Sequence, residues 1–254
     1  MIDWIVQLFI MWEYIILGVL QGIFEWIPIS SEGVIALASQ FLKIQANPID
    51  MALFLHLGTL FAVLVYFRND WKKVLILKSP KLLYFLIISC FISLLIGFPI
   101  YKFVRNIAIG NILLLVMGFG LLLTSYFHKT KKTLGLGLDK LAVIAGGLQG
   151  LAVIPGLSRS GSTIFGLSLG NLSPAQILKL SYMMSAPVIL ASTAYLVLEN
   201  SVLLEAWPSL ISSFLIGFLS LRFLMKIGQT INFYYFTLIF GLLCFLGAII
   251  GFLA

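Results

Sequence analysis

The stretch LQGIFEWIPISSEG, residues 20–33, places Glu25 and Glu32 around a proline and a serine pair inside an otherwise apolar chain. A second stretch, LQGLAVIPGLSRSG, residues 148–161, repeats its glycine and glutamine positions after a shift of 128 residues. Proline interrupts a helix, and the glycines that follow it permit tight bends. The two stretches therefore predict two interrupted helices of the same design.

The composition indicates the class of protein before any motif is considered. Hydrophobic residues make up 61% of the 254 residues, charged residues 10%, and the mean hydropathy is +1.12. These values differ strongly from those of soluble domains and predict an all-α polytopic membrane protein. The net charge of +7 lies in short clusters between apolar runs, which indicates membrane topology and argues against nucleic acid as a partner. Cys90 and Cys244 lie in apolar runs and are expected to pack rather than to form a disulfide.

Six apolar runs are long enough to cross a bilayer. They cover residues 51–67, 82–101, 107–127, 177–198, 207–221 and 233–253. The basic segments that follow the first and third runs fall on one side, which the positive-inside rule assigns to the cytoplasm of a plasma-membrane protein. Lys102 and Arg105 are a mild exception on the opposite side. Both termini are then expected outside the cell.

Two further apolar segments are interrupted, and we expect each to form a re-entrant helical hairpin. They cover Trp12 to Leu42 and Leu141 to Leu169. Because three predicted spans separate them, the second is inverted relative to the first. The sequence thus predicts a single membrane domain, residues 1–254, built as an inverted-topology repeat of about 1–127 and 128–254. Such repeats bring broken helices together near the membrane centre.

The charged residues of the two turns are the first candidates for function. A charge at the bilayer centre costs roughly 2.5 to 3.5 kcal/mol on insertion scales, so it needs a partner or a polar cavity. Glu25 and Arg159 occupy the two turns that the repeat brings together, and we expect them to pair in a functional site. Glu32 either caps a helix N-terminus or takes part in the function, and the sequence favours neither.

The second half of each hairpin begins in a cluster of hydroxyl groups. Helix N-termini and hydroxyls bind anions, and the planar guanidinium of Arg159 suits phosphate oxygens. Because Glu25 would repel a bare phosphate, a bridging divalent cation, Mg²⁺ or Ca²⁺, is the expected cofactor. The hydroxyl-bearing residues are Ser30, Ser31, Ser158, Ser160 and Ser162.

The segments QGIFEWIPISSEGV, residues 21–34, and PGLSRSGSTI, residues 155–164, resemble the two motifs of the undecaprenyl-diphosphate phosphatases associated with bacitracin resistance. The segment FLHLGTLFAVLVYFR, residues 54–68, is also similar, and the resemblance extends over the whole chain. It implies metal-dependent removal of the terminal phosphate from undecaprenyl or another polyprenyl diphosphate, with the site open to the outer face. The product is the lipid carrier that cell-envelope glycan synthesis reuses.

Carried over position by position, the resemblance assigns roles to individual residues. It makes Gln21 and Glu25 the metal-binding pair. The predicted catalytic residues are Glu25, Ser31 and Arg159, with Ser31 or a water as the nucleophile. Glu32, which stands where the family has a small residue, is the fourth candidate. The implied substrate-binding residues are Gln21, Ser30, Ser158, Ser160, Gly161 and Thr163.

One position departs from the family pattern, because Val34 stands where the family usually has a histidine. A valine cannot transfer a proton. Either Glu32 performs the acid–base step or hydrolysis is weak or lost, and His56, flanked by apolar turns, is the less favoured substitute. A transporter or flippase of prenyl phosphate or another anion is the alternative function. A non-catalytic scaffold would not explain Glu25 and Arg159, and a homodimer is left open.

Overall fold

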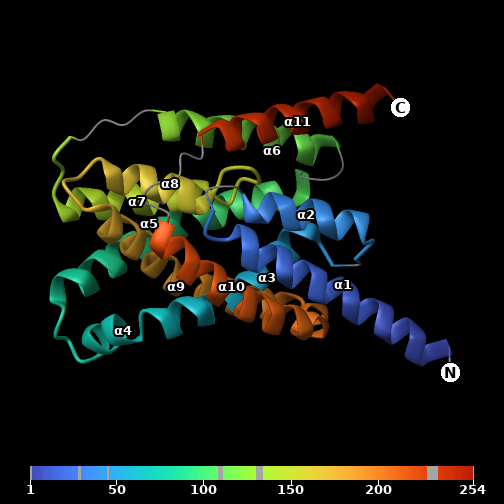
Figure 1. Cartoon of the computed structure of the whole chain (residues 1–254), viewed down its shortest axis with the longest axis horizontal. Helices are drawn as coiled ribbons and strands as arrows, with labels where there is room; N and C mark the ends of the chain where they lie inside the picture. Colours follow the sequence, from blue (N-terminus) through green and yellow to red (C-terminus); the bar gives the residue numbers. More distant parts are fainter. Residues whose placement is uncertain are drawn as a thin grey trace.

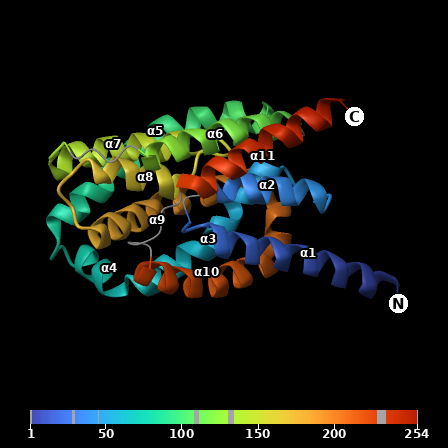
Figure 2. The ribbon, with the colours of Figure 1, turned by 45° about the horizontal axis from the view of Figure 1, so that its top comes forward.

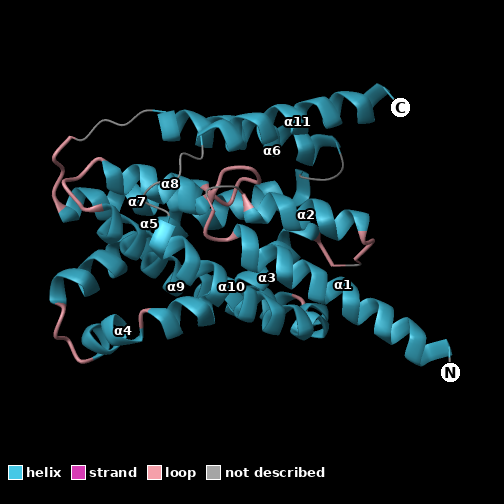
Figure 3. Cartoon of the chain, in the orientation of Figure 1, coloured by secondary structure: helices cyan, strands magenta, loops and turns pink. Residues whose placement is uncertain are grey.

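The structure is a computed structural model that describes residues 2–27, 30–44, 46–107, 111–129, 134–227 and 234–253. Its regular structure is helical apart from one isolated bridge between Leu136 and Gly170 (Figure 3). The elements are α1 (Ile2–Phe24), α2 (Ser31–Phe41), α3 (Pro48–Tyr66), α4 (Arg68–Leu75), α5 (Pro80–Ile107), α6 (Asn111–Lys129), α7 (Leu138–Leu151), α8 (Arg159–Ser168), α9 (Pro174–Glu199), the short 3₁₀ helix η1 (Ser201–Ala206), α10 (Trp207–Ile227) and α11 (Tyr234–Leu253).

The six apolar runs coincide with α3, α5, α6, α9, α10 and α11. Four described segments are long and apolar enough to cross a membrane: Pro48–Tyr66, Pro80–Arg105, Pro174–Glu199 and Leu203–Lys226. The described parts of α6 and α11 contribute shorter apolar helices, Asn111–Tyr126 and Gly241–Phe252. The all-α membrane class is thus confirmed, whereas six crossings and a re-entrant path stay predictions.

Both interrupted segments form a helix, a break and a second helix. In the first, α1 ends at Phe24 and α2 begins at Ser31; in the second, α7 ends at Leu151 and α8 begins at Arg159. Pro28, the predicted helix breaker of the first turn, lies outside the described residues. Each second helix has a serine N-cap, Ser30 or Ser158, whose Oγ accepts a hydrogen bond from a glycine amide at 3.2 Å.

The helices pack in pairs around the two breaks. Helix α1 packs along α10, α7 packs along α5, and α3 and α9 contact each other between these pairs. Helices α6 and α11 lie side by side along one edge of the molecule in both views (Figures 1 and 2). Trp26 anchors the first break, because its side chain is buried and its Nε1 donates to the carbonyl of Gly217 at 2.8 Å. The two breaks are therefore held by packed helices on each side.

The GxxxG spacings of α1 and α7 allow the close helix contacts that the sequence predicts. A Cβ atom at Gly22 would lie 2.6 Å from the amide nitrogen of Gly217 in α10. A Cβ atom at Gly150 would lie 2.8 Å from the carbonyl oxygen of Ser93 in α5. Real Cβ atoms do not approach backbone atoms so closely, so these positions require glycine.

We expect the variant Gly150→Ala to be destabilised, because its methyl group would push α7 away from α5. The expected loss is about 1 to 3 kcal/mol, visible as a lower thermal midpoint of the purified protein. Gly147→Ala is the matched control on the same helix, since its Cβ would meet Ile96 at an ordinary 3.7 Å. Equal midpoints for the two variants would contradict this account of the packing.

An ionic cluster joins α3, α5 and α9 near the predicted outer ends of these helices. The buried Asp50 accepts a hydrogen bond from Tyr101 at 2.7 Å and pairs with Arg105 at 2.5 Å. Arg105 also pairs with Glu199 at 2.7 Å. Two carboxylates therefore surround Arg105 and offset its positive charge. This explains how Arg105 can be an exception to the positive-inside rule on the predicted outer side.

Candidate functional site

Glu25 and Arg159 meet in the interior, as the sequence predicts. Glu25 Oε1 forms an ion pair with Arg159 Nη2. The two residues are only 3% and 8% exposed. Because the pair joins the break after α1 to the first residue of α8, it links the two turns across the centre of the fold.

The other carboxylate oxygen of Glu25, Oε2, is contacted by three polar side chains. Gln21 Nε2 donates to Oε2 at 2.7 Å, and Ser31 Oγ donates to the same atom at 3.0 Å. His56 Nε2 also lies 3.0 Å from this oxygen. Gln21 is one helical turn before Glu25, and Ser31 is the first residue of α2, so helix geometry places both beside the carboxylate.

His56 lies in the site although the sequence disfavoured it. Its Nδ1 lies 2.7 Å from the carbonyl oxygen of Ala52, an acceptor, so Nδ1 carries a proton. Its Nε2 faces two carboxylates, Glu25 at 3.0 Å and Glu32 at 3.5 Å. The sequence contained one usable signal, because an ionisable residue inside a membrane span is a functional candidate by default.

Ser30 connects the two turns directly. Besides capping α2, its Oγ accepts a hydrogen bond from the amide of Gly156 at 2.8 Å. Gly156 has a φ of +94°, and a Cβ there would lie 2.1 Å from the carbonyl oxygen of Met117. Only glycine therefore suits this turn, which brings the second break against the first.

The other predicted substrate-binding residues of the second motif also make contacts within the protein. Ser158 Oγ lies 3.2 Å from Ser160 Oγ, and Ser160 Oγ donates to the carbonyl of Ile27 at 3.1 Å. Thr163 Oγ1 lies 2.6 Å from Ser181 Oγ, and the amide of Gly161 donates to Ser158. These residues hold the turn in shape, and their part in substrate binding stays a prediction.

Several buried polar atoms lack a partner in the described part of the chain. Among them are Arg159 Nε, Arg159 Nη1, Ser162 Oγ and the acceptors Gln21 Oε1 and Gln149 Oε1. An unsatisfied buried polar group costs roughly 1 to 3 kcal/mol, so such atoms indicate that a ligand completes the site. The two Arg159 nitrogens and the Ser162 hydroxyl can donate to an anion, whereas the two glutamine oxygens can accept from a donor or bind a cation.

A cavity of about 50 Å³ is lined by Glu32, His56 and Arg159. It adjoins a second cavity of about 160 Å³ that lies among α3, α5, α7 and α9 and has mostly apolar walls. Both are lined by Leu53, Gln149, Val153, Val188 and Ser192. The charged site therefore has an apolar extension between the helices.

The possible metal ligands in the site fit a divalent cation only in part. Gln21 Oε1 and the carboxylate of Glu25 are oxygen ligands of the type that Mg²⁺ and Ca²⁺ prefer. The described residues hold no group of three or more His, Cys, Asp or Glu side chains that could bind a metal ion. Other ligands, such as phosphate oxygens, would have to complete the coordination of a metal.

The site thus combines a buried charge pair and unpaired donors with an apolar cavity among membrane helices, and this combination suits an integral membrane protein that acts on an amphiphilic anion. Residues 14–246 match the family described as bacitracin resistance protein BacA, and the chain belongs to this family. This result confirms the resemblance seen in the two motifs.

Relatives of this chain align with 72% or more of its residues. It is 34% identical over 254 residues to the undecaprenyl-diphosphatase of Methanococcoides burtonii. This alignment covers 91% of this chain and 96% of the relative. It is 32% identical over 261 residues to the undecaprenyl-diphosphatase of Haloarcula marismortui, with 93% and 96% covered. The corresponding protein of Saccharolobus solfataricus is 36% identical over 201 residues, 72% of each chain.

Proposed function

We propose that this protein is a membrane phosphatase that hydrolyses undecaprenyl diphosphate to undecaprenyl monophosphate and inorganic phosphate. The observation that carries the proposal is the buried Glu25–Arg159 pair, in which Arg159 keeps two nitrogens without a partner in the described residues. A guanidinium can hold one carboxylate oxygen and still present donors to phosphate oxygens. Membership of the BacA family supports the same function.

In the proposed reaction, Arg159 binds the terminal phosphate and stabilises the charge that develops as the bridging P–O bond breaks. The nucleophile, either Ser31 or a water, attacks the terminal phosphorus and loses its proton to the Glu25–His56 pair. With water, this step gives inorganic phosphate directly; with Ser31, it gives a phosphoserine, which a water then hydrolyses to inorganic phosphate and free serine. Undecaprenyl monophosphate leaves with the bridging oxygen. Ser31 Oγ already donates to Glu25 Oε2, so the carboxylate is placed to accept this proton.

His56 supplies the imidazole that Val34 cannot. Val34 packs against the apolar cluster of Met117, Leu121 and Cys244, on α6 and α11. His56 reaches Glu25 and Glu32 from α3 instead, with its other nitrogen fixed by Ala52. We therefore assign proton transfer to His56 and a supporting position beside it to Glu32.

Mg²⁺ or Ca²⁺ is the proposed cofactor, held by Gln21 and Glu25 together with diphosphate oxygens. Mg²⁺ in particular is commonly bound by one or two carboxylates plus substrate phosphates. When bound, the cation neutralises negative charge on the phosphate groups.

In this proposal the isoprene units nearest the diphosphate occupy the apolar cavity of about 160 Å³ between α5 and α9, and the rest of the prenyl tail lies among the lipid-facing helices. That cavity runs from the charged site to Tyr101 and Tyr195, beside the Asp50–Arg105 pair. Both chain ends lie at one end of the molecule, opposite α4 and its lysines (Figure 1). These features support a site that opens to the outer face of the plasma membrane, external termini, and an inverted repeat whose re-entrant turns meet at Glu25 and Arg159.

The function is tested by phosphate release from undecaprenyl diphosphate by the purified protein in detergent. We expect release with Mg²⁺ or Ca²⁺, loss of release after treatment with EDTA, and recovery when either cation is restored. Tight binding of the lipid diphosphate without release under all of these conditions would contradict a phosphatase. That result would favour the transport of a prenyl phosphate.

A further inference from the structure

A separate cavity of about 600 Å³ lies where α4, the start of α5 and the start of α9 meet. It shares no lining residue with the cavity at Glu32 and His56. Its charged lining consists of four lysines and one aspartate, which leaves a net charge of +3. These residues are Asp70, Lys73, Lys78, Lys81 and Lys179. The proposed phosphatase reaction gives this cavity no role.

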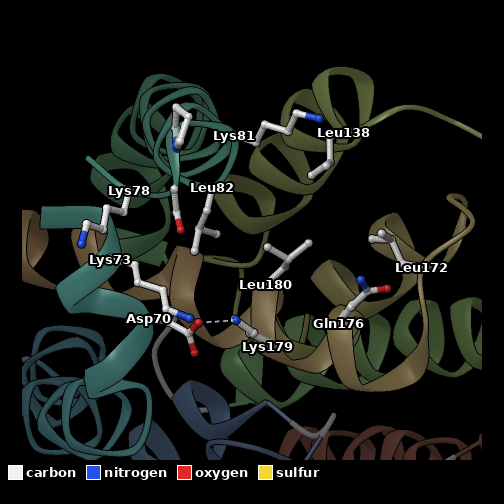
Figure 4. A pocket seen from close by; sticks show the side chains of 12 residues that line it. Asp70, Lys73, Lys78, Lys81, Leu82, Leu138, Leu172, Gln176, Lys179 and Leu180 are labelled. Atoms are coloured by element: carbon white, nitrogen blue, oxygen red, sulfur yellow. Dashed lines mark hydrogen bonds and ion pairs between the residues drawn. The ribbon is translucent and has the colours of Figure 1, made fainter. Parts of the chain in front are cut away.

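Most of this positive charge has no acidic partner within the described residues. Lys179 Nζ lies 2.5 Å from Asp70 Oδ1, so one lysine is neutralised. No carboxylate in the described part of the chain forms an ion pair with Lys73, Lys78 or Lys81. Figure 4 shows Lys73 and Lys179 directed towards Asp70, whereas Lys78 and Lys81 point away from Asp70 and in opposite directions. The cavity therefore carries an excess of three positive charges, and the flexible side chains of Lys73, Lys78 and Lys81 would have to turn towards a bound anion.

The end of α4 and the residues that follow it favour a position of the cavity at the surface of the membrane. Leu75, Ile76 and Leu77 are 78%, 58% and 69% exposed, although all three are large and apolar. They lie directly between Lys73 and Lys78 in the chain. Such a segment is stable in the interfacial layer, where apolar side chains enter the acyl region and lysines reach the headgroups. The ends of α3, α5 and α9, three candidate membrane spans, meet at the same place.

The walls of the cavity distinguish a lipid from a free anion. Leu82, Leu138, Leu172 and Leu180 line it beside the lysines. An inorganic anion would gain nothing from these leucines, whereas the glycerol and first acyl carbons of a phospholipid would pack against them. Basic pockets between membrane helices on the cytoplasmic side bind anionic headgroups by this combination of charge and apolar surface.

We propose that this cavity binds the phosphate headgroup of an anionic phospholipid from the leaflet that carries α4. The phosphate lies among Lys73, Lys78 and Lys81, and the upper acyl carbons lie against the leucines. Bound lipid would tie α4 to α5 and α9 and so stabilise this end of the fold.

The test uses the full-length protein in a neutral detergent and a soluble short-chain lipid, diheptanoyl-phosphatidylglycerol. We expect a saturable increase in the thermal midpoint of the wild type, and no increase with diheptanoyl-phosphatidylcholine. In the double variant Lys78→Gln/Lys81→Gln, the apparent Kd should rise about tenfold or more. The matched control is Lys72→Gln/Lys226→Gln, which removes the same charge from positions outside the cavity and should bind as the wild type does.

Three results would overturn the proposal. They are an equal rise of the midpoint with inorganic phosphate at the same concentration, an unchanged Kd in the pocket variant, and an equal loss of binding in the control. Phosphate release by the pocket variant in detergent should equal that of the wild type, because none of these lysines contacts the Glu25 site. Failure of lipid binding is thereby distinguished from failure of the phosphatase proposal.

Discussion

Replacing Arg159 with alanine should lower the rate of phosphate release by about 10² to 10³, the usual effect of removing one preorganised donor from a developing anion. The variant loses the guanidinium that pairs with Glu25 and whose unpaired nitrogens we propose to bind the phosphate. Arg159→Lys should recover little of this rate, since an ammonium cannot hold a carboxylate and a phosphate in one planar arrangement. The measurement is single-turnover release from undecaprenyl diphosphate.

Arg222→Ala is the matched control, because this arginine is exposed on α10 and lies outside both site cavities. We expect it to retain the wild-type rate. If Arg159→Ala kept its rate within a factor of a few, phosphate binding by this guanidinium would be wrong.

His56→Gln should lower kcat by about 10² to 10⁴, the usual contribution of a positioned proton-transfer group. Glutamine can keep a hydrogen bond to the Glu25 carboxylate but cannot exchange a proton, so the thermal midpoint should change little. The pH profile provides the second readout, because the variant should lose the limb that depends on the imidazole. A pH profile with the same limbs as the wild type would show that His56 only positions Glu25.

Val34→His gives a contrasting expectation at the position where the family usually has its histidine. Val34 packs on the apolar cluster of α6 and α11, so an imidazole there would be buried among apolar groups. We therefore expect no gain in rate. A large increase would mean that hydrolysis lacks an imidazole and that His56 does not supply it.

The sequence predicted the Glu25–Arg159 contact because the energetics leave few alternatives. A charge among membrane helices must find an opposite charge or a polar cavity, and the two motifs each supplied one. The helix starts at Ser31 and Arg159 could be predicted equally well, because a serine cap or a proline break affects only the few residues around it. The positions of both turns could therefore be predicted from the local sequence.

Three features of the structure could not be predicted from the local sequence. Helix α3 is apolar nearly all round, so periodicity does not indicate which side His56 presents to the site. The hydrogen bond between Gly156 and Ser30 likewise depends on how closely two turns approach that are far apart in the chain. Helix α4 was missed because its eight residues lie in a basic loop with no apolar run. These features come from tertiary packing rather than from local pattern.

A double-variant cycle on Glu25→Gln and Arg159→Ala tests most directly whether the two breaks form one catalytic site. Groups that act as a unit give strongly non-additive losses. Single-turnover phosphate release should therefore be about as slow in the double variant as in the slower single variant. If the two losses instead multiplied in full, Glu25 and Arg159 would act independently, and the shared site would be contradicted.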